Sequence, residues 1–89
     1  MNESPPISRL DKWLFHARFC RTRLLAQTAI AAGHVRLNGA RIDKPGQAVK
    51  PGDILTLRMG AKIVAIRVLG LAERRGSAAE ARTLYEVLE

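Results

Sequence analysis

The stretch from Arg9 to Leu55, RLDKWLFHARFCRTRLLAQTAIAAGHVRLNGARIDKPGQAVKPGDIL, determines the fold class, because its hydrophobic period changes at Gly33. Before that glycine, apolar residues recur at helical spacing, beginning with the stripe Leu10, Trp13, Leu14 and Ala17. We therefore expect a first helix that ends near residue 18 and a second over residues 23–32. Together they would form a helical hairpin.

Polar and glycine residues mark the ends of these helices. Ser8 stands three positions before Asp11, which is the spacing of a capping box, and Thr22 is the expected N-cap of the second helix. Gly33 stands where a left-handed residue usually closes a helix. The apolar residues of the second helix would lie on one side, Leu25, Ala29 and Ala32 with Ala26 and Ile30 adjoining.

After Gly33 the period is that of β-strands. Apolar and polar residues alternate over residues 34–38, and Asn38-Gly39 is a strong hairpin signal. Two Pro-Gly turns bracket a short strand at residues 47–49, and two longer strands are expected at residues 54–58 and 62–69. A capping-box spacing at Ser77 and Glu80 opens a last helix that runs to about Tyr85.

These elements predict an α+β fold: a two-helix hairpin packed on a small, strongly curved antiparallel sheet, plus a C-terminal helix. The 89 residues suffice for one domain. We expect a flexible leader at residues 1–7, the domain at residues 8–70 and a C-terminal helical extension at residues 71–89.

Positive charge is concentrated in one region of the chain. Residues 9–62 contain eleven Lys and Arg against three Asp, whereas basic and acidic residues balance over residues 63–89. A regional excess of this kind is typical of a surface that binds a polyanion. Aromatic residues make up only 4%, so binding through phosphates and helical shape fits better than stacking on single-stranded bases.

Several classes of protein are disfavoured by the same sequence. The single cysteine excludes an internal disulfide, and no apolar run approaches the ~18–20 residues of a membrane span. Residues 1–6 lack the apolar stretch of a secretory signal, so we expect a cytoplasmic protein with no membrane contact. His16, His34, Cys20 and the aspartates show no metal or triad spacing, so we expect no enzyme, metal or cofactor.

The candidate binding residues lie on the helices and the first hairpin. We expect one contiguous phosphate-binding surface from the helices and their connector, formed by Arg9, Lys12, Arg18, Arg21, Thr22 and Arg23. Further along the chain, Arg36 and Asn38 would extend it and Arg41 and Lys44 would lie at its rim. The alternative is that these basic residues are ordinary solvated surface charges. For Asn38, the backbone shape that its turn requires explains the presence of asparagine equally well. Trp13 belongs to the core.

The same residues resemble the S4 RNA-binding domain family. The matching features are spread over residues 9–55 and comprise Arg9-Leu10-Asp11, Thr22-Arg23, Ala26, Ile30, Gly33, Val35, Asn38-Gly39 and Gly52-Asp53. Three further segments are similar to the small ribosome-associated heat-shock branch of that family: Lys12 to Leu14, Arg18-Phe19 and Leu84-Tyr85.

The resemblance implies an S4-like (alpha-L) fold and a non-enzymatic protein that binds structured RNA. The implied partner is ribosomal RNA of the large subunit, in a heat-shock, stress or stalled-ribosome context, with possible weak DNA binding and a monomeric state. Two alternatives from other classes stay open. One is a helix-turn-helix-like DNA-binding regulator, and the other is an adaptor whose neutral C-terminal segment binds a protein partner.

Overall fold

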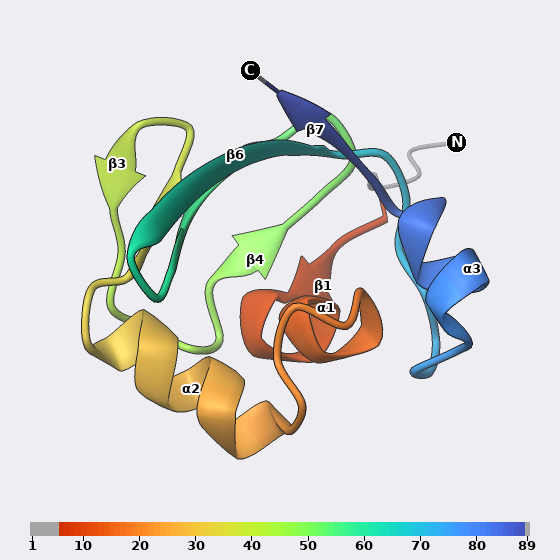
Figure 1. Ribbon diagram of the computed structural model, residues 1–89, viewed down its shortest axis with the longest axis horizontal. Coiled ribbons are helices and arrows are strands. Elements are labelled where there is room, and N and C mark those ends of the chain that lie inside the picture. Colours follow the sequence, from red (N-terminus) through yellow and green to blue (C-terminus); the bar gives the residue numbers. More distant parts are fainter. Residues whose placement is uncertain (1–5, 89) are drawn as a thin grey trace, which may run out of the picture.

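A curved antiparallel sheet arches over two short helices in the computed structural model, which describes residues 6–88 (Figure 1). Five strands form the sheet in the order β3-β2-β5-β6-β7. Their bounds are β2 Val35–Leu37, β3 Ala40–Arg41, β5 Ile54–Met59, β6 Lys62–Val68 and β7 Tyr85–Leu88. A separate two-stranded ribbon pairs β1, Ser8–Arg9, with β4, Ala48–Val49. The predicted α+β class is confirmed.

Three helices accompany the sheet: α1 Leu10–His16, α2 Arg23–Ala31 and α3 Ala78–Arg82. The hydroxyl of Thr22 accepts a hydrogen bond from the amide of Leu25 at 3.0 Å, so the predicted N-cap of α2 is confirmed. The predicted capping box at Ser8 is wrong, because Ser8 lies in β1 and α1 has no side-chain N-cap. The first helix is also shorter than expected, since Arg18 adopts a left-handed conformation with φ of 66°.

The core lies between the two helices and the face of the sheet that they cover. From α1 come Leu10, Trp13 and Leu14, and α2 contributes Ala26 and Ile30. The sheet supplies Val35, Leu55, Leu57, Ile66 and Val68. The prediction that the Leu25 side of α2 forms its apolar face is wrong. The residues of α2 that are buried are Ala26 and Ile30, whereas Leu25 is 51% exposed.

Trp13 is a core residue, as predicted. It is completely buried, and its indole Nε1 donates to the carbonyl oxygen of Gly70 at 2.9 Å. The ring of Phe19 lies between Trp13 and Tyr85, at centroid distances of 6.0 and 4.6 Å. These contacts join the end of α1 to the last strand, so Phe19 is used for packing and not for base stacking.

Strand pairing confirms both predicted hairpins. Leu37 pairs with Ala40 across a two-residue loop in which Asn38 and Gly39 have φ of 50° and 84°, the geometry that Asn-Gly favours. The strands β5 and β6 pair over six residues each, and Gly60 in their turn also has positive φ. Every strand in the sheet is antiparallel to its neighbours.

The C-terminal segment differs from the prediction in its second half. Ser77 caps α3 as expected, through a bond from the amide of Glu80 at 3.2 Å. The helix ends at Arg82, and residues 85–88 pair with β6 as the edge strand β7. The expected helical extension at residues 71–89 is therefore partly strand and is built into the sheet. Of the expected leader at residues 1–7, residues 1–5 lie outside the described residues.

Candidate nucleic-acid interface

A buried carboxylate organises the predicted site on the two helices. Asp11, in the first turn of α1, has no exposed surface. Its Oδ1 accepts from Nε of Arg9 at 3.1 Å and from the amide of Lys12 at 2.8 Å. Its Oδ2 accepts from Nη2 of Arg9 at 3.1 Å, from Nη2 of Arg23 at 3.3 Å and from Nε2 of Gln27 at 3.0 Å. We call Arg9, Asp11, Arg23 and Gln27 the Asp11 cluster.

The Asp11 cluster holds two guanidinium groups at the surface. The side chains of Arg9 and Arg23 remain 51% and 44% exposed, although both donate to the buried carboxylate. A guanidinium has five N–H donors, so each arginine keeps donors for a further oxygen ligand. Fixing the side chains in advance lowers the conformational entropy lost when a phosphate binds.

Electrostatics keep this carboxylate ionised. Burial raises the pKa of Asp11, but the hydrogen bonds from Arg9, Gln27, the Lys12 amide and Arg23 outweigh that effect and lower it from 3.8 to about 2. The nearby cations also act on His16, which is buried at the end of α1. Desolvation lowers the pKa of His16, and the charges of Lys12 and Arg23 lower it further.

The loop between β3 and β4 lies beside Arg9. The amide of Asp11 donates to the carbonyl of Pro45 at 3.2 Å. Gly46 lies beside the Arg9 guanidinium, since a side chain on it would begin 3.5 Å from Cζ of Arg9, an ordinary contact distance. Lys44, in the same tight turn, is exposed and is thereby brought near the Asp11 cluster.

The connector before α2 adds further exposed groups. Within residues 6–88, the exposed side chain of Arg21 makes no hydrogen bond or ion pair, and Thr22 and Arg23 follow it directly. Leu24 and Leu25, in the first turn of α2, are 69% and 51% exposed. The sequence prediction did not single out these two leucines as site residues, and they stand exposed between Arg23 and the rest of α2.

Arg18 was predicted to bind RNA and is used structurally here. Its Nε donates to the carbonyl of Gly76 at 2.8 Å. A second bond runs from Nε of Arg75 to the carbonyl of Phe15 at 3.1 Å, and the Arg75 guanidinium lies 5.1 Å from the centre of the Phe15 ring. The two arginines fasten the segment before α3 to the end of α1. A role of Arg18 in RNA binding stays a prediction.

Asn38 also has a structural role. Its Oδ1 accepts from the amide of Ile54 at 2.9 Å, and its Nδ2 donates to Oδ1 of Asp53 at 3.1 Å. Asp53 is buried and accepts in addition from the amide and the ammonium of Lys50. Desolvation raises the pKa of Asp53, but these bonds outweigh it and the net shift is downward.

Arg36 and Arg41 do not join the Asp11 cluster. Arg36 is flanked in β2 by the core-facing residues Val35 and Leu37, so it lies on the opposite face of the sheet, and Arg41 pairs directly with it. The helices cover only the core face (Figure 1). The predicted single contiguous surface is therefore wrong for these two arginines.

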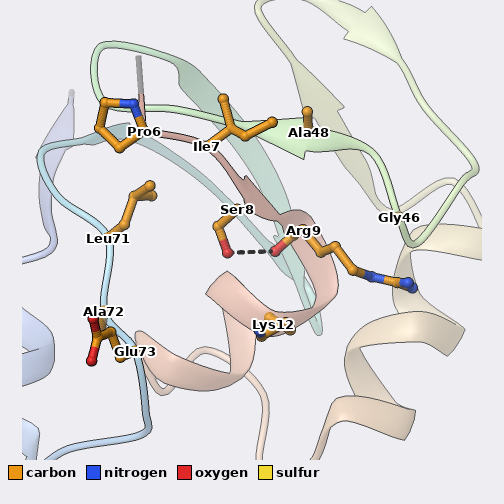
Figure 2. A pocket seen from close by; sticks show the side chains of 10 residues that line it. All are labelled: Pro6, Ile7, Ser8, Arg9, Lys12, Gly46, Ala48, Leu71, Ala72 and Glu73. Carbon is orange, nitrogen blue, oxygen red and sulfur yellow. Dashed lines mark hydrogen bonds between the residues drawn. The ribbon is translucent and has the colours of Figure 1, made fainter. Parts of the chain in front are cut away.

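An open groove of about 700 Å³ adjoins the Asp11 cluster on the side of β1. Figure 2 shows Ser8 and Lys12 on one side of it and Leu71, Ala72 and Glu73 on the other. Arg9 and Gly46 also line the groove, and the side chain of Arg9 extends toward Gly46. The groove thus places one more cation, Lys12, next to an apolar surface.

Within the described residues 6–88, Cys20 is partly buried and His16 is buried. Burial raises the pKa of the Cys20 thiol, and Nδ1 of His16 is 3.1 Å from the carbonyl of Ala72. In that part of the chain, no group of three or more His, Cys, Asp or Glu could hold a metal ion. The helices described there are also too short and too polar to cross a bilayer.

Comparison with known proteins identifies similar sequences and a similar structure. Residues 8–55 match the S4 domain. The chain is 47% identical over 81 residues to the heat shock protein 15 homolog of Aeromonas salmonicida, covering 91% of this chain and 61% of that protein. It is 45% identical over 87 residues to heat shock protein 15 of Escherichia coli strain K12, covering 97% and 65%. The chain therefore spans less than two thirds of the length of these relatives.

Two further similar proteins are matched over a larger share of their own length. The RQC P-site tRNA stabilizing factor of Halalkalibacterium halodurans is 39% identical over 79 residues, which are 89% of this chain and 88% of that protein. The trimeric structure of Vibrio cholerae heat shock protein 15 superimposes with a TM-score of 0.88 at 40% identity, covering 93% of this chain and 83% of that one.

Proposed function

The chain belongs to the S4 domain family, and from this premise we propose that it is a ribosome-associated RNA-binding protein that acts by binding alone. The observation that carries the proposal is the pair Arg9 and Arg23, which one buried carboxylate holds half-exposed at the surface. Two fixed guanidinium groups, with the exposed Arg21 two residues before Arg23, suit the phosphates of a folded RNA.

Ribosomal RNA of the large subunit is the specific partner that we propose. Relatives of this chain are named heat shock protein 15, and one is named for stabilising a P-site tRNA. We propose by analogy that this chain acts on ribosomes under stress or after stalling, in the cytoplasm. Monomeric action is part of the proposal, whereas the relative from Vibrio cholerae is trimeric, so the mass in solution needs to be measured.

The alternative of a DNA-binding regulator is disfavoured by the contacts of α2. Arg23 and Gln27 are the side chains of this helix best suited to base edges, and both are bonded to Asp11. A recognition helix needs such groups free at its exposed face. Phosphate contacts remain available and account for weak DNA binding without sequence preference.

Titration of large ribosomal subunits and of 23S ribosomal RNA at several salt concentrations tests the proposal. Each phosphate neutralised contributes a slope of about −0.7 to −0.9 in log K against log salt, so contacts by Arg9, Arg21 and Arg23 predict a slope of about −2 to −3. Small subunits and duplex DNA of equal charge are the comparison ligands. Absence of binding at low salt would refute the proposed function, and equal affinity for small subunits would refute the choice of subunit.

A further inference from the structure

The outer face of the sheet carries three arginines that the helical site does not use. Arg36 in β2, Arg41 in β3 and Arg58 in β5 are all exposed. Within residues 6–88, the side chains of these three arginines take part in no ion pair or hydrogen bond. We call these three residues the outer-sheet patch.

Strand register places the outer-sheet patch on the face opposite the helices. Val35 pairs with Leu57 and Leu37 pairs with Leu55, and all four belong to the core or pack against it. Arg36 lies between the two β2 residues and pairs with Thr56 on β5, so both point to the other face. Arg58 is two residues beyond Thr56 and therefore points the same way.

Arg36 and Arg41 place two like charges side by side on the exposed face of the sheet. The two residues are direct partners in the antiparallel pair β2–β3. Side chains in such positions lie about 5 Å apart at Cβ, and like charges there are destabilising. A phosphate that bridges both guanidinium groups would remove the repulsion and gain charge-assisted hydrogen bonds.

The surface between these arginines is shaped to receive a ligand. A hollow of about 120 Å³ is lined by Gly33, His34, Arg36, Thr56, Arg58 and Ile63. Gly33 has φ of 80°, and a side chain there would begin 2.8 Å from Nη2 of Arg41, so the Arg41 guanidinium lies against this lining residue of the hollow. Ile63 is 73% exposed and offers an apolar contact for a ribose.

On the side toward β7, the outer-sheet patch is followed by an acidic residue, Glu86. Further along the same face, Arg67 forms an ion pair with Glu86, so the sheet is neutral toward β7. Among the arginines on the outer face of the sheet within residues 6–88, those without an ion pair therefore lie at the β3, β2 and β5 end. The hollow is lined by two arginines, Arg36 and Arg58, and by one imidazole, His34, so its charge favours a phosphodiester backbone as the ligand.

We propose that the outer-sheet patch is a second RNA-binding surface, which takes the backbone of a double-helical RNA segment while the Asp11 cluster holds another. This inference rests on the proposed function and adds to it a second contact on the opposite face. The protein would then join two RNA segments.

Co-capture of two RNA duplexes tests the inference. One duplex of about 16 base pairs carries a fluorophore and a second carries biotin, so only a protein bound to both brings the fluorophore to streptavidin. The test variant is Arg36→Gln, Arg41→Gln and Arg58→Gln together. The control is Lys62→Gln, Arg74→Gln and Arg82→Gln, three exposed residues whose replacement changes the net charge equally.

We expect the test variant to lose co-capture by at least about tenfold and to keep its affinity for a single duplex within about threefold, with the control unchanged. Thermal melting shows that both variants fold. Co-capture at the wild-type level by the test variant would overturn the second surface alone, and so would wild-type protein that binds one duplex and never two. Absence of any duplex binding would overturn the proposed function as well. Displacement of RNA from the patch by polyglutamate at the same concentration of negative charge as the RNA would indicate a protein partner and overturn the RNA assignment.

Discussion

Oδ2 of Asp11 lies 3.3 Å from Nη2 of Arg23, so one buried carboxylate links the first turn of α1 to the first turn of α2. The same carboxylate binds Arg9 through both of its oxygens. The buried carboxylate of Asp11 therefore positions the guanidinium groups of Arg9 and Arg23, which we propose contact RNA. We therefore expect both the stability of the fold and its affinity for RNA to depend on Asp11.

Asp11→Asn should weaken both properties. The amide keeps the size of the side chain but cannot accept all the hydrogen bonds, and two guanidinium groups lose their counter-charge. We expect the free energy of unfolding to fall by about 2–3 kcal/mol and the affinity for RNA to fall in samples that are still folded. Chemical denaturation and RNA titration at low temperature measure the two effects. Asp43→Asn is the matched control, because Asp43 is exposed and unpaired among residues 6–88.

Acid should remove the stability that Asp11 contributes. Its folded-state pKa of about 2 lies below the ordinary aspartate value of 3.8, so its contribution is complete well above pH 3.8 and is lost as the pH falls through 2. The loss corresponds to about 2 kcal/mol, since one pKa unit is about 1.4 kcal/mol. Denaturation curves between pH 5 and pH 2 measure it. The Asp11→Asn variant should show a smaller decrease over this range, and an identical decrease would show that other carboxylates are responsible.

Local signals in the sequence predicted most of the secondary structure. The Asn38-Gly39 turn, the Thr22 cap and the Ser77 cap each depend on residues within a few positions of one another, and all three are present. The strand β7 was missed because its formation depends on pairing with β6, far away in the sequence. The capping box at Ser8 failed for a related reason: the Asp11 carboxylate binds arginines instead of closing the helix start.

The sequence predicted a set of basic residues for the site, but it did not predict which of them lie together on one face of the protein. Alternation along β2 correctly placed Arg36 away from Val35. It gave no information on which face of the sheet the helices cover, and so the two groups of arginines were assigned to one surface. The bonds from Arg23 and Gln27 to Asp11 span 12 and 16 residues, and only the packing of α1 against α2 brings these groups together.

Asn38→Gly should separate the structural role of Asn38 from a role in binding. Glycine tolerates the positive φ of this position, so the turn is kept, but the bonds to Ile54 and Asp53 are lost. We expect a decrease of about 1–2 kcal/mol in the free energy of unfolding and unchanged RNA affinity in the folded state. Equilibrium unfolding and RNA titration give the two numbers. A tenfold loss of affinity in fully folded protein would instead assign Asn38 to the interface.

Arg21→Glu should reduce RNA binding without reducing stability. Arg21 is exposed, and within residues 6–88 its side chain is free of ion pairs, so its replacement breaks no contact of the fold. Substitution of Arg9 or Arg23 by Glu is less informative, because each would place a carboxylate against Asp11 and destabilise the protein. We expect Arg21→Glu to lower the affinity about tenfold, to decrease the steepness of the salt dependence, and to change the free energy of unfolding by less than about 0.5 kcal/mol.

Arg82→Glu on α3 changes the net charge by the same amount at an exposed position away from the Asp11 cluster. Equal losses in the two variants would mean that net charge alone governs binding, and the connector before α2 would then have no special part in the interface.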